Sequence, residues 1–245
     1  MPDSSIQLSQ QKHRYWALIP AAGIGTRMAA AIPKQYIKLH GKEVLAWTLE
    51  VLTSLDFLEK IVLVLHPDDN YFSKKMSADF PDVLQVEGGE ERQHSVSNGL
   101  NFLKTLASDD DWILVHDAAR PCVKAEDIHK LINELEGNPV GGILASRVRD
   151  TLKQADNSLR VKSTLDRNDY WLAATPQLFR FKLLLDALNS VKASNQIATD
   201  EAAAIEALGL PVKLVEGHRD NIKITSSEDL ALAEFLLEQA GKVDA

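Results

Sequence analysis

One stretch near the N-terminus decides the fold: Trp16-Ala17-Leu18-Ile19-Pro20-Ala21-Ala22-Gly23-Ile24-Gly25-Thr26-Arg27-Met28, followed shortly by Pro33-Lys34-Gln35-Tyr36. The apolar run before Pro20 predicts a buried parallel strand, because strands covered on both faces carry few polar residues. Small residues and two glycines follow, and they let the backbone approach a ligand closely. Successive N–H groups in such a loop can point at an anion, and Arg27 and Lys34 add positive charge on either side. The stretch therefore predicts a phosphate-binding loop.

Two common glycine motifs do not account for this loop. The pair Gly23-x-Gly25 is followed by Thr26, Arg27 and Met28, so the third glycine of the dinucleotide-binding G-x-G-x-x-G motif is missing. The Gly-Lys-Ser/Thr of the Walker motif is missing as well. A plain strand-to-helix turn is the alternative, but the two flanking cations favour an anion site.

Apolar runs alternate with segments of helical periodicity along the rest of the chain. We expect strands at 15–19, 60–65, 83–86, 111–116, 140–145, 212–215 and 222–224, and helices at 44–55, 96–106, 128–135, 181–188, 199–208 and 227–239. Strands separated by helices form βαβ units with parallel strands and right-handed crossovers. The predicted fold class is α/β, with a mostly parallel Rossmann-like sheet flanked by helices.

The pattern changes between Val148 and Arg167. Leu159, Val161 and Leu165 alternate with polar residues after a turn at 156–158, which predicts a β-hairpin. An isolated hairpin is only marginally stable in water, so its apolar face must pack on something. The hairpin either packs on its own domain or forms a protruding arm that embraces a second subunit.

Composition limits the classes of function. With 245 residues, 45% of them hydrophobic, the chain can bury one α/β core, so we expect a loose tail at 1–14 and a single domain at 15–245. The net charge of −8 disfavours nucleic acid and anionic membranes as partners. The lone cysteine, Cys122, excludes a disulfide framework and indicates a reducing compartment. No apolar run approaches the ~20 residues of a membrane span, and we expect a cytoplasmic protein.

The third expected strand leads into Gly88-Gly89-Glu90-Glu91-Arg92-Gln93-His94-Ser95. One interpretation is a polar turn that enters a capped helix. The other is a base-binding loop, because close-packed glycines offer backbone groups to a pyrimidine edge and the amine of cytosine needs an acceptor.

The fourth expected strand ends in Val115-His116-Asp117-Ala118-Ala119-Arg120-Pro121. Ligands of parallel sheets bind at the carboxyl ends of strands, and Mg²⁺ favours one or two carboxylates together with phosphate oxygens. We therefore predict Asp117 as a Mg²⁺ ligand, the alternative being a turn or N-cap aspartate. His116 lies in an apolar run and receives no chemical role. Arg120 either reaches the substrate phosphate or braces the loop.

Together these motifs resemble the 2-C-methyl-D-erythritol 4-phosphate cytidylyltransferases, within the sugar-phosphate nucleotidyltransferases. Later segments add to the resemblance, which covers nearly all of 16–238: Val148-Arg149-Asp150-Thr151, Asp166-Arg167-Asn168, Ala174-Thr175-Pro176-Gln177, Thr199-Asp200-Glu201 and Asp220-Asn221-Ile222-Lys223. At one position the chain departs from the family, which usually has Gly-Gly-Asp-x-Arg where this chain has Glu90. That departure leaves the contact of this side chain with the nucleotide open.

The resemblance implies a set of ligand contacts and an assembly. CTP is held by Ala21, Ala22, Gly23, Ile24, Gly25, Thr26, Arg27, Lys34, Gly89, Glu90 and Ser95. Methylerythritol phosphate is surrounded by Thr151, Arg167, Thr175, Thr199 and Lys223, with Arg120 as a further candidate. The resemblance also favours the hairpin as a dimerisation arm at 148–167, and hence a homodimer.

The charge of the substrate suggests how such an enzyme would work. A phosphate monoester has its second pKa near 6, so at neutral pH it can attack the α-phosphorus of CTP without a general base. Catalysis then consists of positioning and charge stabilisation, with Arg27, Lys34 and Lys223 as the expected catalytic cations and Mg²⁺ on Asp117.

Two alternatives remain open at the level of the sequence. One is a cytidylyltransferase of the same fold for another polyol phosphate, such as ribitol 5-phosphate. The other is a non-catalytic nucleotide-binding regulatory protein, for which loss of Lys34, Asp117 or Lys223 would be expected. All three residues are present.

Overall fold

Strand β1 (Tyr15–Pro20) lies between two parallel neighbours, β4 (Leu58–Leu65) and β6 (Trp112–Val115). The computed structural model describes residues 13–23, 32–72 and 76–243. Residues 16–19 of β1 are almost completely buried, because helices cover both faces of the sheet at this point. The apolar run at the start of the chain is therefore a central strand, as the sequence predicts.

The described residues form a seven-stranded sheet in the order β11-β7-β10-β6-β1-β4-β5. Its other members are β5 (Val83–Glu87), β7 (Gly141–Arg147), β10 (Trp171–Arg180) and β11 (Lys213–Glu216). Strand β10 runs antiparallel to both of its neighbours, and the remaining pairs are parallel. The fold is thus α/β with a mostly parallel sheet, as expected.

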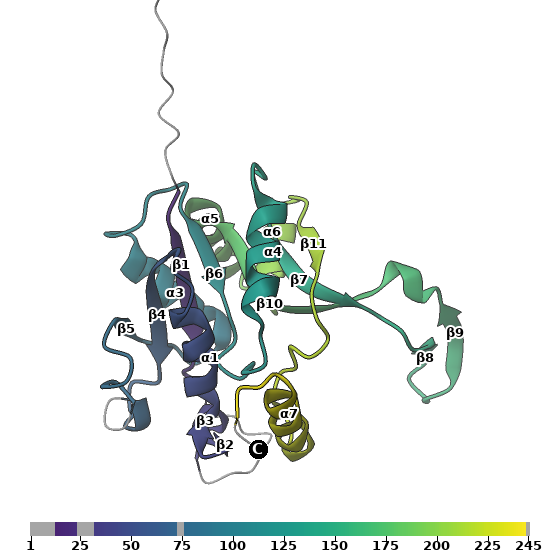
Figure 1. Cartoon of the computed structure of the whole chain (residues 1–245). Coiled ribbons are helices and arrows are strands. Elements are labelled where there is room, and N and C mark those ends of the chain that lie inside the picture. The colour runs from purple at the N-terminus through teal and green to yellow at the C-terminus, as the bar shows by residue number, and fades with distance from the viewer. Residues whose placement is uncertain (1–12, 24–31, 73–75, 244–245) are drawn as a thin grey trace, which may run out of the picture.

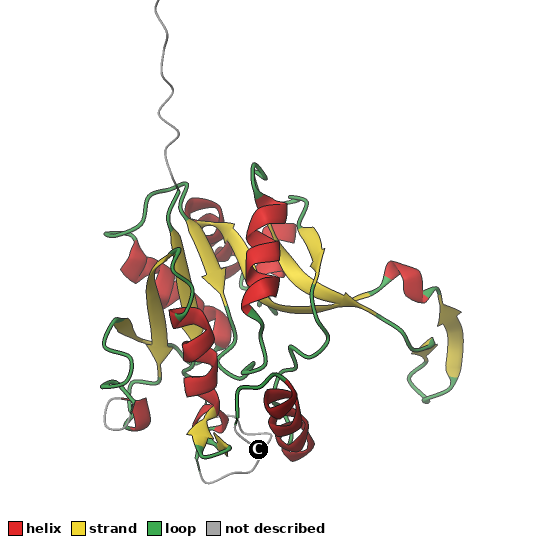
Figure 2. Cartoon of the chain, in the orientation of Figure 1, coloured by secondary structure: helices red, strands yellow, loops and turns green. Residues whose placement is uncertain are grey.

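Helices cover the two faces of this sheet (Figure 2). On one face, α1 (Val44–Thr53) and α4 (Ala125–Leu135) contribute leucines and isoleucines to a single apolar cluster. On the other face, α3 (Arg92–Leu103), α5 (Phe181–Ala193) and α6 (Glu201–Glu206) do the same. A smaller cluster joins α7 (Ser227–Gln239) to the short hairpin β2 (Lys38–Leu39) and β3 (Lys42–Glu43). No helix within these described stretches is long and apolar enough to cross a membrane.

The hairpin of β8 (Leu152–Ala155) and β9 (Val161–Leu165) protrudes from the sheet in Figure 1. Its pairing confirms the predicted hairpin, but Leu159 is wrongly included in the alternating strand. This residue lies in the turn with φ 58° and is 90% exposed. Val161 of β9 and Leu172 at the base of the arm are also exposed, at 65% and 53%. Leu159, Val161 and Leu172 are thus open to solvent in the single chain, whereas Leu152 and Leu165 are only partly exposed.

Several predicted boundaries are wrong for local physical reasons. Residues 222–224 form no strand: Ile224 N donates to Ala119 O, but the segment forms no ladder. Helix α6 begins at Glu201, two residues after the predicted Thr199, because the carboxylate of Asp200 accepts a hydrogen bond from Ala203 N at 2.9 Å and caps the helix there. Helix α3 already begins at Arg92 and ends at Leu103, before the predicted Leu106.

Strand β10 is missing from the sequence prediction altogether. Pro176 interrupts its apolar pattern, and proline removes a donor from a ladder, so the segment does not read as a central strand. The structure accommodates this proline at an irregularity in the pairing with β7, between Ala173 and Gln177.

Candidate active site

A cavity of about 620 Å³ opens at the carboxyl ends of β1 and β6. Ligands of open α/β sheets bind where the strand order reverses. In this sheet the chain places β4 and β5 on one side of β1 and then β6 on the other side. The cavity is lined by residues 20–23, 34–35, 89–92, 95, 117–119, 223 and 225. Five separate stretches of the chain therefore meet at one hollow.

Close packing explains the two glycines of the loop after β5. A Cβ added to Gly88 would lie 2.5 Å from the Cβ of Ala22, and one added to Gly89 would lie 2.5 Å from the Cβ of His94. The loop after β5 is thus pressed against the loop after β1. Ser95, only 2% exposed, supports this arrangement because its Oγ accepts a hydrogen bond from Gly89 N at 3.2 Å. These contacts fix the backbone that would meet a nucleotide.

Gln35 and Lys34 tie the loop after β1 to the rest of the cavity. Gln35 Nε2 donates to the carbonyl oxygens of Ala21 at 2.7 Å and Gly23 at 3.2 Å, which holds the described start of the glycine loop. Lys34 Nζ donates to Ile224 O at 2.9 Å, so this ammonium group is located beside the segment that carries Lys223. Two lysines far apart in the sequence are thereby brought to the same cavity.

Asp117 is surrounded by three cations. Its Oδ1 accepts from Arg92 Nε at 3.0 Å, while its Oδ2 lies 3.0 Å from Lys223 Nζ and 3.3 Å from Arg120 Nε. Burial alone would raise the pKa of Asp117, but the charges of Arg92, Lys223 and Arg120 outweigh burial and hold this pKa well below its usual range. Asp117 is therefore ionised at neutral pH.

His116 has a structural role, as the sequence predicts. Its side chain is completely buried, and burial lowers its pKa to about 4. Nε2 lies 3.3 Å from the carbonyl oxygen of Arg120, which can only accept, so this nitrogen carries the proton. The hydroxyl of Thr175 then donates to Nδ1 and accepts from Asp117 N, both at 3.0 Å. The neutral imidazole and Thr175 together position the backbone of Asp117.

The structure brings together part of the predicted site. Lining the cavity are Ala21, Ala22, Gly23, Lys34, Gly89, Glu90, Ser95, Asp117 and Lys223. Ile24, Gly25, Thr26 and Arg27 lie outside the described residues.

Arg120 braces the loop, one of its two predicted roles, because its Nη1 donates to Asn221 O at 2.7 Å. It lines an adjoining cavity of about 230 Å³ together with Lys223. Thr175 is 4% exposed and points its hydroxyl at His116.

The remaining predicted residues do not line the cavity in the single chain. Thr151 and Arg167 flank the protruding hairpin, and Arg167 Nη1 donates to the carbonyl oxygen of Arg149. Thr199 is exposed just before α6. Thr151 and Arg167 can therefore reach an active-site cavity only if the arm moves, or if the cavity belongs to another copy of the chain.

Sequence reasoning missed the role of Arg92, Glu201 and Gln35. All three are within motifs that carry the resemblance, but periodicity cannot reveal that Glu201 is only 1% exposed or which cation it meets. An arginine three residues after a pair of glycines, as Arg92 is, was the available signal.

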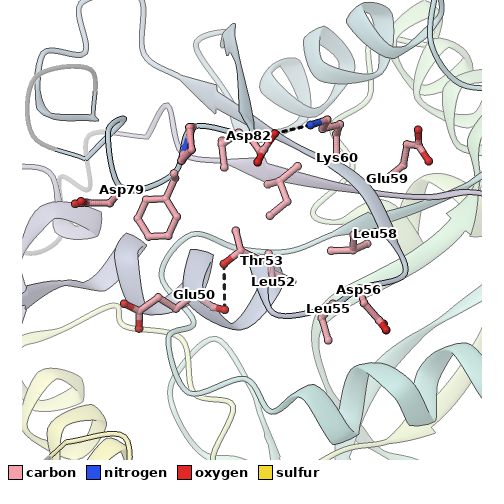
Figure 3. Close-up of a pocket in the computed structure, with 14 residues that line it drawn as sticks. Glu50, Leu52, Thr53, Leu55, Asp56, Leu58, Glu59, Lys60, Asp79 and Asp82 are labelled. Carbon is pink, nitrogen blue, oxygen red and sulfur yellow. Dashed lines mark hydrogen bonds and ion pairs between the residues drawn. The ribbon is translucent and has the colours of Figure 1, made fainter.

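A second hollow of about 610 Å³ lies at the amino ends of β4 and β5 (Figure 3). Carboxylates dominate its rim, and its one lining cation, Lys60, pairs with Asp82 at 2.7 Å. Such a hollow repels a polyphosphate, whereas the cavity at the carboxyl ends offers Lys34 and Lys223.

Fold and cavity together define a class. A mostly parallel sheet with a glycine loop after its first strand, and lysines and an ionised aspartate at the carboxyl ends, is the arrangement of a nucleotidyltransferase. The family model of 2-C-methyl-D-erythritol 4-phosphate cytidylyltransferase matches residues 15–239. The chain belongs to this family of enzymes.

Individual relatives agree with this assignment. A 2-C-methyl-D-erythritol 4-phosphate cytidylyltransferase from Vibrio vulnificus (strain CMCP6) is 47% identical over 223 residues, which are 91% of this chain and 94% of the relative. One from Pseudoalteromonas translucida (strain TAC 125) is 49% identical, over 91% and 90% of the two chains. The crystal structure of the Francisella tularensis enzyme matches with a TM-score of 0.77 and 38% identity, over 91% of this chain and all of that one. A crystal structure of 4-diphosphocytidyl-2C-methyl-D-erythritol synthase matches with a TM-score of 0.80 and 38% identity, over 92% of this chain and 99% of that one.

Proposed function

We infer that this protein transfers CMP from CTP to 2-C-methyl-D-erythritol 4-phosphate, releasing pyrophosphate and forming 4-diphosphocytidyl-2-C-methyl-D-erythritol for isoprenoid precursor synthesis. A phosphate oxygen of the polyol forms a bond to the α-phosphorus of CTP, and the bond from that phosphorus to the departing pyrophosphate breaks. The observation that carries this conclusion is the meeting of Lys34, Asp117 and Lys223 in one cavity of a chain that belongs to the family.

The cations and loops of the proposed site contact different parts of the two substrates. Lys34 and Lys223 attract the phosphates of both substrates and stabilise the negative charge that builds up on the transferred group, with Arg27 as a third cation. Ala21, Ala22, Gly23, Ile24, Gly25 and Thr26 bind the triphosphate through their backbone, and Gly89, Glu90 and Ser95 bind the cytidine. Thr151, Arg167, Thr175 and Thr199 complete the polyol phosphate side. Arg120, which braces the loop through Asn221 O and lines the adjoining cavity, is a further candidate on that side.

Asp117 is the proposed ligand of a divalent cation, Mg²⁺. The chemistry of the donors fits an ion that arrives with the nucleotide: the described residues contain no group of three or more metal-binding side chains, and Mg²⁺ bound with phosphates needs only one or two carboxylates. When bound, Mg²⁺ would neutralise triphosphate charge and favour the departure of pyrophosphate. Lys223 shares Oδ2 of Asp117 at 3.0 Å, so its ammonium group would have to move toward the phosphates.

The hairpin is the proposed dimerisation arm of a cytoplasmic homodimer whose chains each contain one domain at 15–245. Support comes from its exposed apolar side chains, Val161 and Leu172, which a single described chain leaves uncovered. Each active site would then combine Lys34 of one chain with Arg167 of the other.

Subunit mixing tests this arrangement. Lys34→Ala and Arg167→Met proteins, each nearly inactive alone, are mixed under conditions that allow dimers to exchange. About half of the dimers become mixed, and each mixed dimer has one site with both lesions and one with neither, so about a quarter of all sites should regain activity. As a matched control, mixing Lys34→Ala with Lys223→Ala should restore nothing, because both lysines belong to one chain's cavity. If the first mixture also stays inactive, Arg167 does not act across the dimer.

A further inference from the structure

Arg92 joins three loops that meet at the candidate active site. It is the first residue of α3, three residues after Gly89. Its Nε donates to Asp117 at the end of β6, and its two terminal nitrogens donate to Glu201, the first residue of α6, at 2.7 and 3.0 Å. One guanidinium group thus connects the proposed cytidine loop, the proposed metal ligand and the segment that carries Thr199.

The geometry of this cluster is well defined. The Arg92–Glu201 pair is bidentate, which fixes the plane of the guanidinium group as well as its position. The side chains of Glu201 and Asp117 are 1% and 9% exposed, and that of Arg92 is 26% exposed. Burial would lower the pKa of Arg92, but the two carboxylates outweigh burial and raise it, so the cluster contains one permanent cation between two anions.

The two oxygens of Asp117 consequently have different surroundings. Oδ1 is occupied by Arg92, while Oδ2 is shared by Lys223 and Arg120. Lys223 is the most exposed of these three cations, at 37%, and it lines both cavities. Oδ2 is therefore the oxygen that an incoming cation can reach by displacing a half-exposed ammonium group.

We propose that Arg92 is a positioning residue that holds the Asp117 carboxylate with Oδ2 toward the nucleotide's metal ion, and that Glu201 keeps the Arg92 guanidinium group in place for this task. Glu201 also neutralises Arg92, which would otherwise pair with both oxygens of Asp117 and compete with the metal. This role presupposes Asp117 as the metal ligand of the proposed function.

The proposal separates two effects of the same pair. Removing one partner of a buried ion pair destabilises a protein because it leaves an uncompensated charge, whereas replacing both partners by apolar residues of similar volume is often neutral. The double variant Arg92→Met/Glu201→Met should therefore recover the thermal stability that each single variant loses. It should not recover the positioning of Asp117.

Calorimetric titration of the enzyme with CTP, with and without Mg²⁺ and with no polyol phosphate present, gives the decisive quantity. This quantity is the factor by which Mg²⁺ tightens CTP binding. Loss of a residue that orients a metal ligand typically costs 10–100-fold in metal affinity, and we expect this factor to fall by about that amount in the double variant, in Arg92→Lys and in Glu201→Gln. CTP affinity without Mg²⁺ should stay within about threefold of wild type, since neither residue is assigned a nucleotide contact.

Controls separate the possible failures. Arg14→Met removes a cation from Asp111, paired at 2.9 Å at the opposite end of β6, and should lower stability without changing the Mg²⁺ factor. Asp117→Asn should lose the Mg²⁺ factor; if it keeps this factor, the proposed metal ligand itself is wrong. If Asp117→Asn loses the Mg²⁺ factor while the double variant retains it, Arg92 has only a structural role and the inference is overturned. Where the double variant does not fold, retention of the Mg²⁺ factor by Arg92→Lys and Glu201→Gln has the same meaning.

Discussion

Asp117→Asn should both destabilise the protein and abolish its response to Mg²⁺. The substitution nearly preserves the shape of the side chain but removes the negative charge that three cations share at 3.0–3.3 Å. Losing one partner of a buried ion pair typically costs about 3–5 kcal/mol. In the variant Arg92 keeps its ion pair with Glu201, and the side chain of Lys223 is 37% exposed to water. We therefore expect a destabilisation at the lower end of this range, about 3 kcal/mol. For a chain of this size that corresponds to a fall in Tm of about 6–12 °C.

Thermal unfolding and a Mg²⁺ titration of pyrophosphate release measure the two effects on the same preparations. Asp82→Asn is the matched control, because Asp82 also pairs with a lysine, at 2.7 Å, but its side chain is 83% exposed. This control should leave both readouts nearly unchanged. A fall in Tm of less than about 2 °C for Asp117→Asn would refute the ion-cluster reasoning. An unaltered Mg²⁺ dependence would show that Asp117 is not the metal ligand.

Three further outcomes follow from individual side chains. Lys34→Ala should lower kcat by about 10²–10³ with a smaller change in the KM for CTP, because Lys34 acts on charge that develops in the transition state; steady-state kinetics within threefold of wild type would exclude it from the mechanism. Burial raises the pKa of the Cys122 thiol to about 11, which lowers the fraction of reactive thiolate. At pH 8, alkylation of the native protein should therefore be at least about 100-fold slower than alkylation of the unfolded chain, and equal rates would contradict the buried position of Cys122. Gly141 has φ 134°, and an added Cβ would lie 2.3 Å from Leu178 O, so Gly141→Ala should cost about 1–3 kcal/mol in urea unfolding, whereas an unchanged midpoint would show that the strand pairing relaxes freely.

The parallel part of the sheet could be predicted because each of its strands is locally apolar. Residues 16–19 and 61–65 are buried on both faces, and such strands stand out in the sequence. Strand β10 could not be predicted in this way, since Pro176 is tolerated only through an irregular pairing that depends on β7. The prediction for residues 222–224 is wrong in the opposite sense. Their local pattern favours a strand, but the segment forms no ladder with another strand.

The candidate site shows the same division between local and tertiary information. Lys34, Asp117 and Lys223 could be predicted because each belongs to a motif with a recognisable chemistry, and all three line the cavity. The Arg92–Glu201 pair could not, because it joins α3 to α6 and the sequence contains no sign of which carboxylate a given arginine meets. Thr175 is assigned to the substrate side through its motif, but the sequence contains no sign that its hydroxyl also supports His116 and Asp117.

The most direct test of the account is pyrophosphate release by the purified enzyme with CTP and a panel of polyol phosphates. We expect kcat/KM to be highest for 2-C-methyl-D-erythritol 4-phosphate, and the Lys34→Ala and Lys223→Ala proteins to lose this activity. The panel should include ribitol 5-phosphate, which would use the same nucleotide site but a different polyol contact. An equal or higher kcat/KM for ribitol 5-phosphate, or no pyrophosphate release with any member of the panel, would contradict the proposed function.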